Sequence, residues 1–136
     1  MMTVSVPARL PALGVLRMAV GGLGPFYAGR EPAPSATDMW GWALAVYEAA
    51  TNVVLHGHDG GSDAPITLTV APERDHVVFT LHDTGRPNPA WPYQPRPIPE
   101  LAEDGRGMAI IHRVMAEVTY GRDGLGRNVL TMRACF

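Results

Sequence analysis

The segment from Met39 to Gly57 constrains the fold of this 136-residue chain more than any other stretch. Its side chains are apolar around nearly the whole circumference of a helix, a pattern that is typical of a buried helix. Ser35, Thr37 and Asp38 precede it, and each is a suitable N-cap. Gly57 supplies a stop signal, since glycine is favoured just beyond the last helical turn. The sequence therefore predicts a long helix inside the protein.

Polar side chains interrupt this apolar helix at only a few positions. They are Glu48, Thr51, Asn52 and His56, apart from the hydroxyl group of Tyr47. Glu48, Asn52 and His56 recur every four residues, and each such step rotates roughly 40° about the helix axis, so they form one stripe. A carboxylate is costly in apolar surroundings unless it is paired, bound to a metal or facing a wet cavity. The stripe therefore predicts either a functional site or a set of hydrogen bonds inside the core.

The chemistry of these side chains narrows what a site could do. Glu48 offers a base or a water-mediated contact to a metal ion. Asn52 offers an uncharged oxygen, which is a suitable ligand for Mg²⁺ beside phosphate groups. His56 stands near the expected helix end, where we interpret it as a partner of the helix dipole. A zinc site is not predicted, because the histidines match no usual spacing of zinc ligands.

Hydrophobic periodicity predicts the elements around this helix. In chain order we expect a strand at 4–6, a helix from 12 onward, the buried helix, a hairpin of strands at 66–70 and 76–82, a helix from 107 to 118, a turn at 121–126 and a closing strand at 129–134. This order predicts a single domain, residues 1–136. Its fold class is an α+β two-layer sandwich, with helices on one face of a mixed, mostly antiparallel sheet.

Composition excludes several classes of partner. The net charge is -2 and no basic block occurs, so neither nucleic acid nor an anionic membrane is expected as a direct partner. No apolar run reaches the roughly 18 residues that a membrane span requires. Arg9 and Arg17, together with Pro7 and Pro11, make the N-terminus a poor signal peptide. The single cysteine, Cys135, cannot form an internal disulfide. We therefore expect a cytoplasmic protein.

Two glycine-containing segments lie where one element gives way to the next. Asp83-Thr84-Gly85-Arg86-Pro87 closes a strand, and Gly105-Arg106-Gly107 precedes a helix. Glycines at a helix start allow backbone N–H groups to approach a phosphate closely, and the helix dipole favours the anion. Each segment alone is a weak signal, because glycine turns are common.

The stretch between the two glycine segments, about residues 86–106, is rich in proline. Six prolines fall between Pro87 and Pro99, too many for a helix or a central strand. A long irregular segment inside a small domain is often a functional lid, although a surface loop is the alternative. Trp91 and Tyr93 favour packing against the rest of the protein.

The order of these motifs resembles that of a known family. Glu48-x-x-x-Asn52-x-x-x-His56-Gly57 is similar to the N box of the histidine-kinase-like (GHKL) ATPases. The segment 83–87 resembles their first glycine box, and 105–108 resembles the second. The short chain, with Arg17 on a first helix and a terminal strand that ends Leu130-Thr131-Met132, looks most like the bacterial anti-sigma factor serine-protein kinases. The resemblance covers residues 4–136.

The resemblance implies a Bergerat-type ATP-binding fold with ATP and Mg²⁺ as cofactors. It implies that Asn52 ligates Mg²⁺ beside the phosphates and that Glu48 is the catalytic base or orients the attacking hydroxyl. Asp83 would accept a hydrogen bond from the adenine amino group, in a pocket shaped by Gly85. The phosphates would be held by backbone amides of the second glycine segment, Gly105, Arg106, Gly107 and Met108.

The implied partners are a sigma factor and a small antagonist protein that becomes phosphorylated, and a homodimer is implied as well. Two departures concern catalysis. Leu55 stands where many relatives carry a lysine or arginine, and Arg96 is the one basic residue between Asn88 and Asp104. Either departure could lower catalysis and spare nucleotide binding. A non-catalytic, ATP-binding partner-switch regulator of the same fold is therefore the alternative function.

Overall fold

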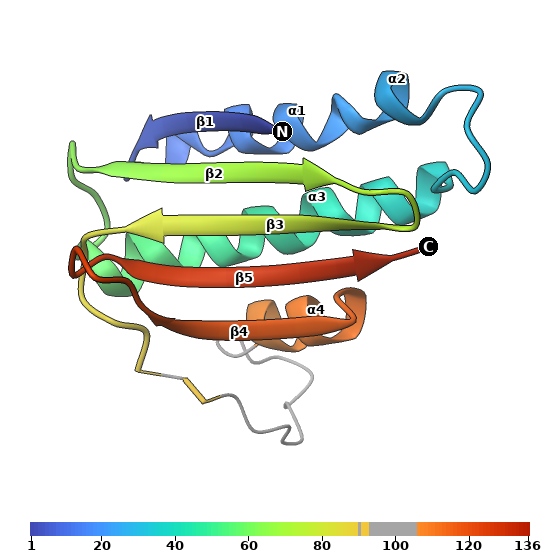
Figure 1. Ribbon diagram of the computed structural model, residues 1–136. Coiled ribbons are helices and arrows are strands. Elements are labelled where there is room, and N and C mark those ends of the chain that lie inside the picture. Colours follow the sequence, from blue (N-terminus) through green and yellow to red (C-terminus); the bar gives the residue numbers. More distant parts are fainter. Residues whose placement is uncertain (90, 93–105) are drawn as a thin grey trace.

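The computed structural model describes residues 1–89, 91–92 and 106–136 (Figure 1). Within these residues, the strands form one five-stranded sheet in the order β1-β2-β3-β5-β4. Every pairing between these strands is antiparallel. Their bounds are Met2–Pro7 for β1, Pro65–Pro72 for β2, His76–Asp83 for β3, Glu117–Arg122 for β4 and Asn128–Cys135 for β5.

Helices form a second layer on one face of the sheet (Figure 1). The helix α3 lies at the centre of this layer and contacts α1 and α4. The expected α+β two-layer sandwich is therefore confirmed. In the described ranges, no helix is both long and apolar enough to cross a membrane. The helix bounds are Gly14–Gly21 for α1, Leu23–Tyr27 for α2, Ala36–Asn52 for α3 and Arg106–Val114 for α4, with a 3-10 turn at Leu10–Ala12 and a π-helical turn at Val53–Gly57.

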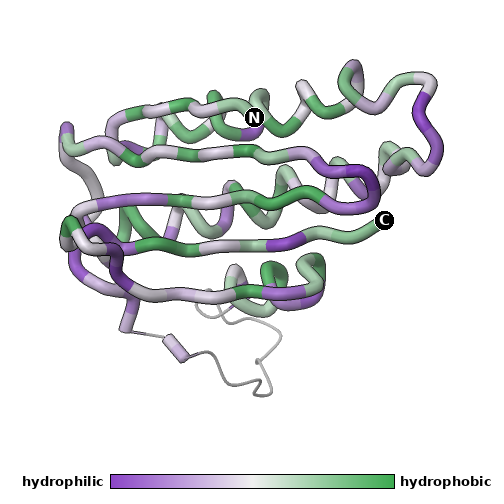
Figure 2. The backbone as a smooth tube through the Cα atoms, in the orientation of Figure 1, coloured by the Kyte–Doolittle hydropathy of each residue, from purple (hydrophilic) through white to green (hydrophobic). Residues whose placement is uncertain are grey.

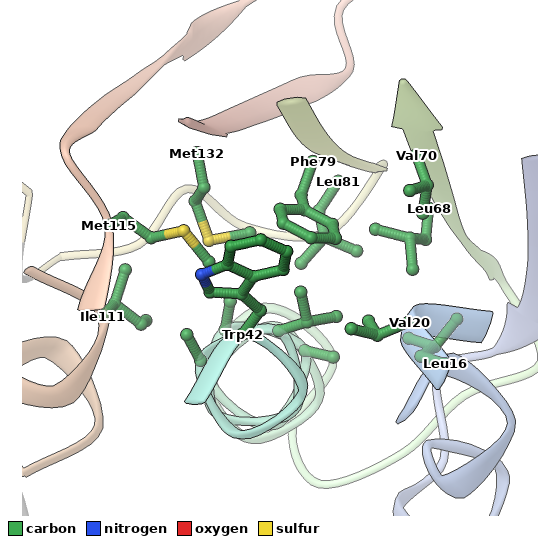
Figure 3. Close-up of a cluster of buried hydrophobic side chains, with 14 of the residues drawn as sticks. Leu16, Val20, Trp42, Leu68, Val70, Phe79, Leu81, Ile111, Met115 and Met132 are labelled. Atoms are coloured by element: carbon green, nitrogen blue, oxygen red, sulfur yellow. The ribbon is translucent and has the colours of Figure 1, made fainter. Parts of the chain in front are cut away.

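The core fills the space between the sheet and the helices. Burial alternates along β3, where Val77, Phe79 and Leu81 are at most 1% exposed and face the helices. From the helix layer, Trp42 of α3 points toward the sheet (Figure 3), and its ring centroid lies 6.1 Å from that of Phe79. Because each large aromatic side chain buries much apolar surface, this pair fixes α3 against the centre of the sheet.

The opposite face of the sheet is covered by none of the described helices. The strand register places one threonine from each strand in a single row across this face: Thr3, Thr69, Thr80, Thr131 and Thr119. Threonine suits such a row, because its branched Cβ favours strands and its hydroxyl tolerates water. The turn between β2 and β3 is also hydrophilic (Figure 2). An antiparallel sheet with one covered face commonly exposes the other in this way.

The central helix begins and ends close to the expected residues. Ser35 is the N-cap, and its hydroxyl accepts from the backbone N–H of Asp38 at 3.0 Å while the Asp38 carboxylate accepts from the Ser35 N–H at 2.8 Å. This reciprocal capping box satisfies two backbone donors at the helix start. The helix is less enclosed than its apolar circumference suggests, because α1 and α4 flank it and leave Trp40 65% exposed and Leu55 46% exposed.

The strand β4 was not expected from the sequence. The predicted helix from residue 107 to residue 118 ends at Val114, and residues 121–122 belong to β4 rather than to a turn. Val118 continues the helical spacing but lies on the strand, where it pairs with Met132. The chain changes partner at Ala116, whose N–H donates to the carbonyl of Arg133 in β5 at 2.7 Å. Pairing with β5 therefore overrides the local periodicity, aided by the β-branched Val118 and Thr119.

Candidate functional site

The π-helical turn that follows α3 contacts the first glycine segment directly. The N–H of Arg86 donates to the carbonyl of Gly57 at 3.0 Å. A Cβ atom on Gly85 would lie 2.5 Å from that carbonyl oxygen and 2.7 Å from Nε2 of His58. Only glycine fits between these groups without a shift of the backbone. The close approach explains why a glycine follows β3 at this position.

The second glycine segment contacts the polar stripe of α3. A Cβ atom on Gly107 would lie 2.9 Å from Oε2 of Glu48 and 3.7 Å from Nδ2 of Asn52. The first turn of α4 therefore packs against the two polar side chains that the sequence singled out. Since backbone N–H groups at a helix start favour an anion, this junction can hold a negatively charged group.

A narrow pocket lies between α3, α4 and the adjoining ends of β3, β5 and β4. Its volume is about 20 Å³, which suffices for about one water molecule and not for a purine ring. The sequence singled out some of the lining residues, namely Asn52, His56, Gly57, Asp83, Arg86 and Met108. It did not point to Asn88, Ile111, Tyr120 and Leu130. Trp91, which was expected only to pack on the protein, is also part of the wall.

Asp83 is the buried carboxylate of this pocket and is only 5% exposed. One of its oxygens, Oδ1, accepts from the N–H of Gly85 at 2.8 Å and from Nδ2 of Asn128 at 3.1 Å. Nε2 of His58 lies 3.6 Å from the same oxygen. No donor in the described part of the chain bonds to the other oxygen, Oδ2. Asp83 therefore has one oxygen tied into the protein and one left as an acceptor for a ligand.

Asn128 fixes this carboxylate from the neighbouring strand, where it pairs directly with Asp83. It is 1% exposed, and its Nδ2 also donates to the carbonyl of Gly85 at 2.8 Å. Its oxygen Oδ1 is buried without a partner among the described residues. Such an orphaned polar atom usually marks an unseen water or ligand. The signal that could have found Asn128 is its inward position on a strand whose other inward residues are apolar.

Aromatic residues form the wall of the pocket beside β4. The ring of Trp91 lies 5.6 Å from that of Tyr120 and 5.9 Å from that of His112, measured between centroids. The hydroxyl of Tyr120 accepts from the N–H of Asn88 at 2.8 Å. Burial raises the pKa of Tyr120 above its ordinary value, so the phenol is protonated near neutral pH. Sequence reasoning missed this wall because it assigned no strand to residues 117–122.

The remaining predicted site residues lie apart from the pocket wall. Glu48 stands beside Gly107 and is not among the lining residues. Arg106 is exposed as the first residue of α4. Gly105 falls outside the described residues, as do Tyr93, Arg96 and most of the expected lid at 86–106.

The chain was compared with known protein families and curated proteins. A family model described as "Histidine kinase-like ATPase domain" matches residues 27–134. The chain is 31% identical over 91 residues to the anti-sigma F factor of Bacillus velezensis, a match that covers 63% of this chain and 62% of that protein. It is 27% identical over 127 residues to the serine-protein kinase RsbW of Halalkalibacterium halodurans, covering 88% and 74% of the two chains. The chain thus spans less than two thirds of the first of these relatives.

Solved structures share the fold. A histidine kinase domain from the Erythrobacter litoralis blue-light activated histidine kinase EL346 aligns with a TM-score of 0.53 and 17% identity, over 95% of this chain and 61% of that one. The SiaB–SiaC complex from Pseudomonas aeruginosa contains a chain that aligns with a TM-score of 0.57 and 11% identity, over 100% and 90% of the two chains. The family model covers more than half of the sequence, and the fold and motif order agree with it, so this chain belongs to the histidine kinase-like ATPase domain family.

Proposed function

We propose that this chain binds Mg²⁺-ATP in the pocket between α3, β3 and α4, and that it phosphorylates a serine or threonine of an antagonist protein. It also sequesters a sigma factor or an equivalent partner, so that phosphorylation of the antagonist sets which partner is held. The names of its relatives, an anti-sigma factor and a serine-protein kinase, support both parts of this proposal.

The observation that carries nucleotide binding is the state of Asp83. Its Oδ1 is held by Gly85 and Asn128, while Oδ2 receives no hydrogen bond within the described residues. A buried carboxylate oxygen without a donor is costly unless a ligand supplies one. The exocyclic amine of adenine is such a donor.

The phosphate end of the site is supported by the contact between α3 and α4. Gly107 has no side chain, so the first turn of α4 is accessible to a phosphate group from the side of Glu48 and Asn52. Asn52 lines the pocket and offers an amide oxygen to a hard cation. Mg²⁺-ATP supplies the phosphoryl group, and the metal ion neutralises charge on the phosphates.

Glu48 is the residue proposed to act on the attacking hydroxyl. It receives no hydrogen bond and no ion pair from the described residues, so its carboxylate is available to accept a proton from a partner's serine or threonine. Its position at Gly107 puts it at the start of α4, next to the proposed phosphate position. Glu48 therefore orients or deprotonates the hydroxyl while the glycine segment holds the phosphates.

The second candidate is a non-catalytic regulator in which ATP only sets partner affinity. It is favoured by Leu55, which lies 46% exposed on the π-helical turn and brings no positive charge near the phosphates. Calorimetry with Mg²⁺-ATP tests binding, and phosphate transfer to small antagonist proteins encoded beside this chain tests catalysis. Tight binding without transfer to any such protein would leave the non-catalytic regulator, whereas no binding would reject both candidates.

A further inference from the structure

Tyr120 stands opposite Asp83 across the pocket. It pairs with Leu130 of β5, and Leu130 pairs with Leu81 of β3, so these three side chains share the face that points to the helices. Asp83 lies two residues beyond Leu81 on the same face. Because β5 separates β3 from β4, and neighbouring strands lie about 4.8 Å apart, Asp83 and Tyr120 project from strands roughly 10 Å apart. Leu130 forms the floor between them.

The hydroxyl of Tyr120 is oriented but has an unused proton. Its oxygen accepts the N–H of Asn88 at 2.8 Å, and Trp91 packs against its ring. A phenol can donate one hydrogen bond as well as accept. No acceptor for that proton is present in the part of the chain that the structure describes. Burial raises the pKa of Tyr120, which keeps this proton in place at neutral pH.

The pocket thus presents a free acceptor on Asp83 and a free donor on Tyr120. Adenine carries the complementary pair, since its amino group donates beside a ring nitrogen that accepts. Guanine carries a carbonyl in place of the amino group. It would put an acceptor against the Asp83 carboxylate, which is repulsive and leaves a buried polar group unpaired.

We propose that the hydroxyl of Tyr120 is a specificity-determining group that donates to a ring nitrogen of adenine while Asp83 accepts from the adenine amino group. This inference rests on the proposed ATP binding and adds the residue that reads the second position of the base. The ring nitrogen is N1 or N7, because each lies beside the amino group.

Calorimetry with base analogues tests the proposal. The proteins are the wild type, Tyr120→Phe and the control Tyr47→Phe, a tyrosine outside the pocket whose ring lies against Arg17. The ligands are Mg²⁺ complexes of ATP, 1-deaza-ATP, 7-deaza-ATP and GTP. Loss of one neutral hydrogen bond should weaken ATP binding by about three- to ten-fold in Tyr120→Phe and leave Tyr47→Phe unchanged.

The analogues separate base reading from a merely structural role. One deaza analogue should bind the wild type about three- to ten-fold more weakly than ATP does, and Tyr120→Phe should bind that analogue and ATP equally. Equal ATP affinity in Tyr120→Phe and wild type would overturn the proposal. So would an equal loss for ATP and both analogues, which would assign Tyr120 only to holding Asn88. Wild-type protein that binds no adenine nucleotide would instead reject the proposed function itself.

Discussion

Gly107 lies so close to Glu48 that a Cβ atom on the glycine would stand 2.9 Å from the carboxylate oxygen Oε2. The contact joins the two sequence motifs that are proposed to hold the phosphates and the attacking hydroxyl. The crowded atom is the end of a flexible side chain, which can rotate away. At Gly85 the crowded atoms are instead the carbonyl group of Gly57 and the ring of His58. The two glycines should therefore differ sharply when each is replaced by alanine.

Gly85→Ala should lower the free energy of unfolding by about 1–3 kcal/mol, because the new Cβ forces the π-helical turn to move. Gly107→Ala should change it by less than about 1 kcal/mol, since the gain in helix propensity offsets the shift of Glu48. Nucleotide affinity should nevertheless fall in Gly107→Ala. Urea denaturation and calorimetry measure the two effects. Gly21→Ala, where a Cβ meets nothing within 4 Å, is the control. Equal destabilisation at 85 and 107 would contradict the prediction.

Asp83→Asn should keep the fold and lose adenine. The new amide oxygen can still accept from Gly85 and Asn128, but its NH₂ group would face the amino group of the base. We expect ATP affinity to fall by about 1.5–3 kcal/mol, the scale of a hydrogen bond to a charged group. Calorimetry gives the affinity, and thermal melting checks the fold. Unchanged affinity in a folded variant would remove Asp83 from the adenine site.

Much of the fold could be predicted from sequence because the relevant signals are local. The alternation in β2 and β3 correctly indicated the hairpin, and the capping residues before α3 indicated where it begins. The stripe of Glu48 and Asn52 indicated a site, because few explanations exist for a carboxylate in so apolar a helix. The contact of this stripe with Gly107 could be expected only through resemblance to a family, since it joins segments far apart in the chain.

The rest could not be predicted, for physical reasons that are also specific. Strand β4 carries an apolar spacing that fits a continuing helix, and only its pairing with β5 decides between the two. Without β4, Tyr120 had no place at the pocket. Asn128 looks like an ordinary turn residue until the register sets it beside Asp83. Base recognition here depends on register between strands, which hydrophobic periodicity does not determine.

Nucleotide binding should change the surroundings of Trp91. The pocket has room for about 20 Å³, so an adenine ring requires movement of a wall residue, and Trp91 is held there by ring contacts with Tyr120 and His112. Tryptophan fluorescence should therefore change with Mg²⁺-ATP and saturate at the dissociation constant found by calorimetry. The change should vanish in Trp91→Phe, which retains Trp40 and Trp42. A full signal in that variant would place the movement elsewhere.

Tyr27 should make the stability of the protein depend on alkaline pH. Its hydroxyl donates to the carbonyl of Glu73 and ties α2 to the turn between β2 and β3. Burial raises its pKa above the ordinary value near 10, so the folded state holds the proton more tightly than the unfolded state does. Its contribution is therefore complete below about pH 10 and is lost as pH rises through the folded-state pKa.

The variant Tyr27→Phe isolates this contribution. It should cost about 1 kcal/mol at pH 7, the usual net value of one hydrogen bond. Its unfolding free energy should then fall less steeply than that of the wild type above about pH 10. Urea denaturation at several pH values measures both quantities. Parallel pH curves for the two proteins would show that Tyr27 does not cause the alkaline loss of stability.

Glu48→Gln distinguishes a kinase from a passive binder. The substitution keeps the shape of the side chain beside Gly107 and removes its basicity. If Glu48 orients or deprotonates the partner's hydroxyl, phosphorylation of the antagonist protein should fall by about 10²–10⁴-fold, the usual contribution of a general base. Mg²⁺-ATP affinity should change far less, because Glu48 does not line the pocket that holds the base. Asn52→Ala is the contrasting variant and should weaken Mg²⁺-dependent binding and turnover together. Phosphate transfer and calorimetry on the same preparations give both readouts. A Glu48→Gln protein that phosphorylates the antagonist at the wild-type rate would assign the carboxylate to packing against α4 rather than to catalysis.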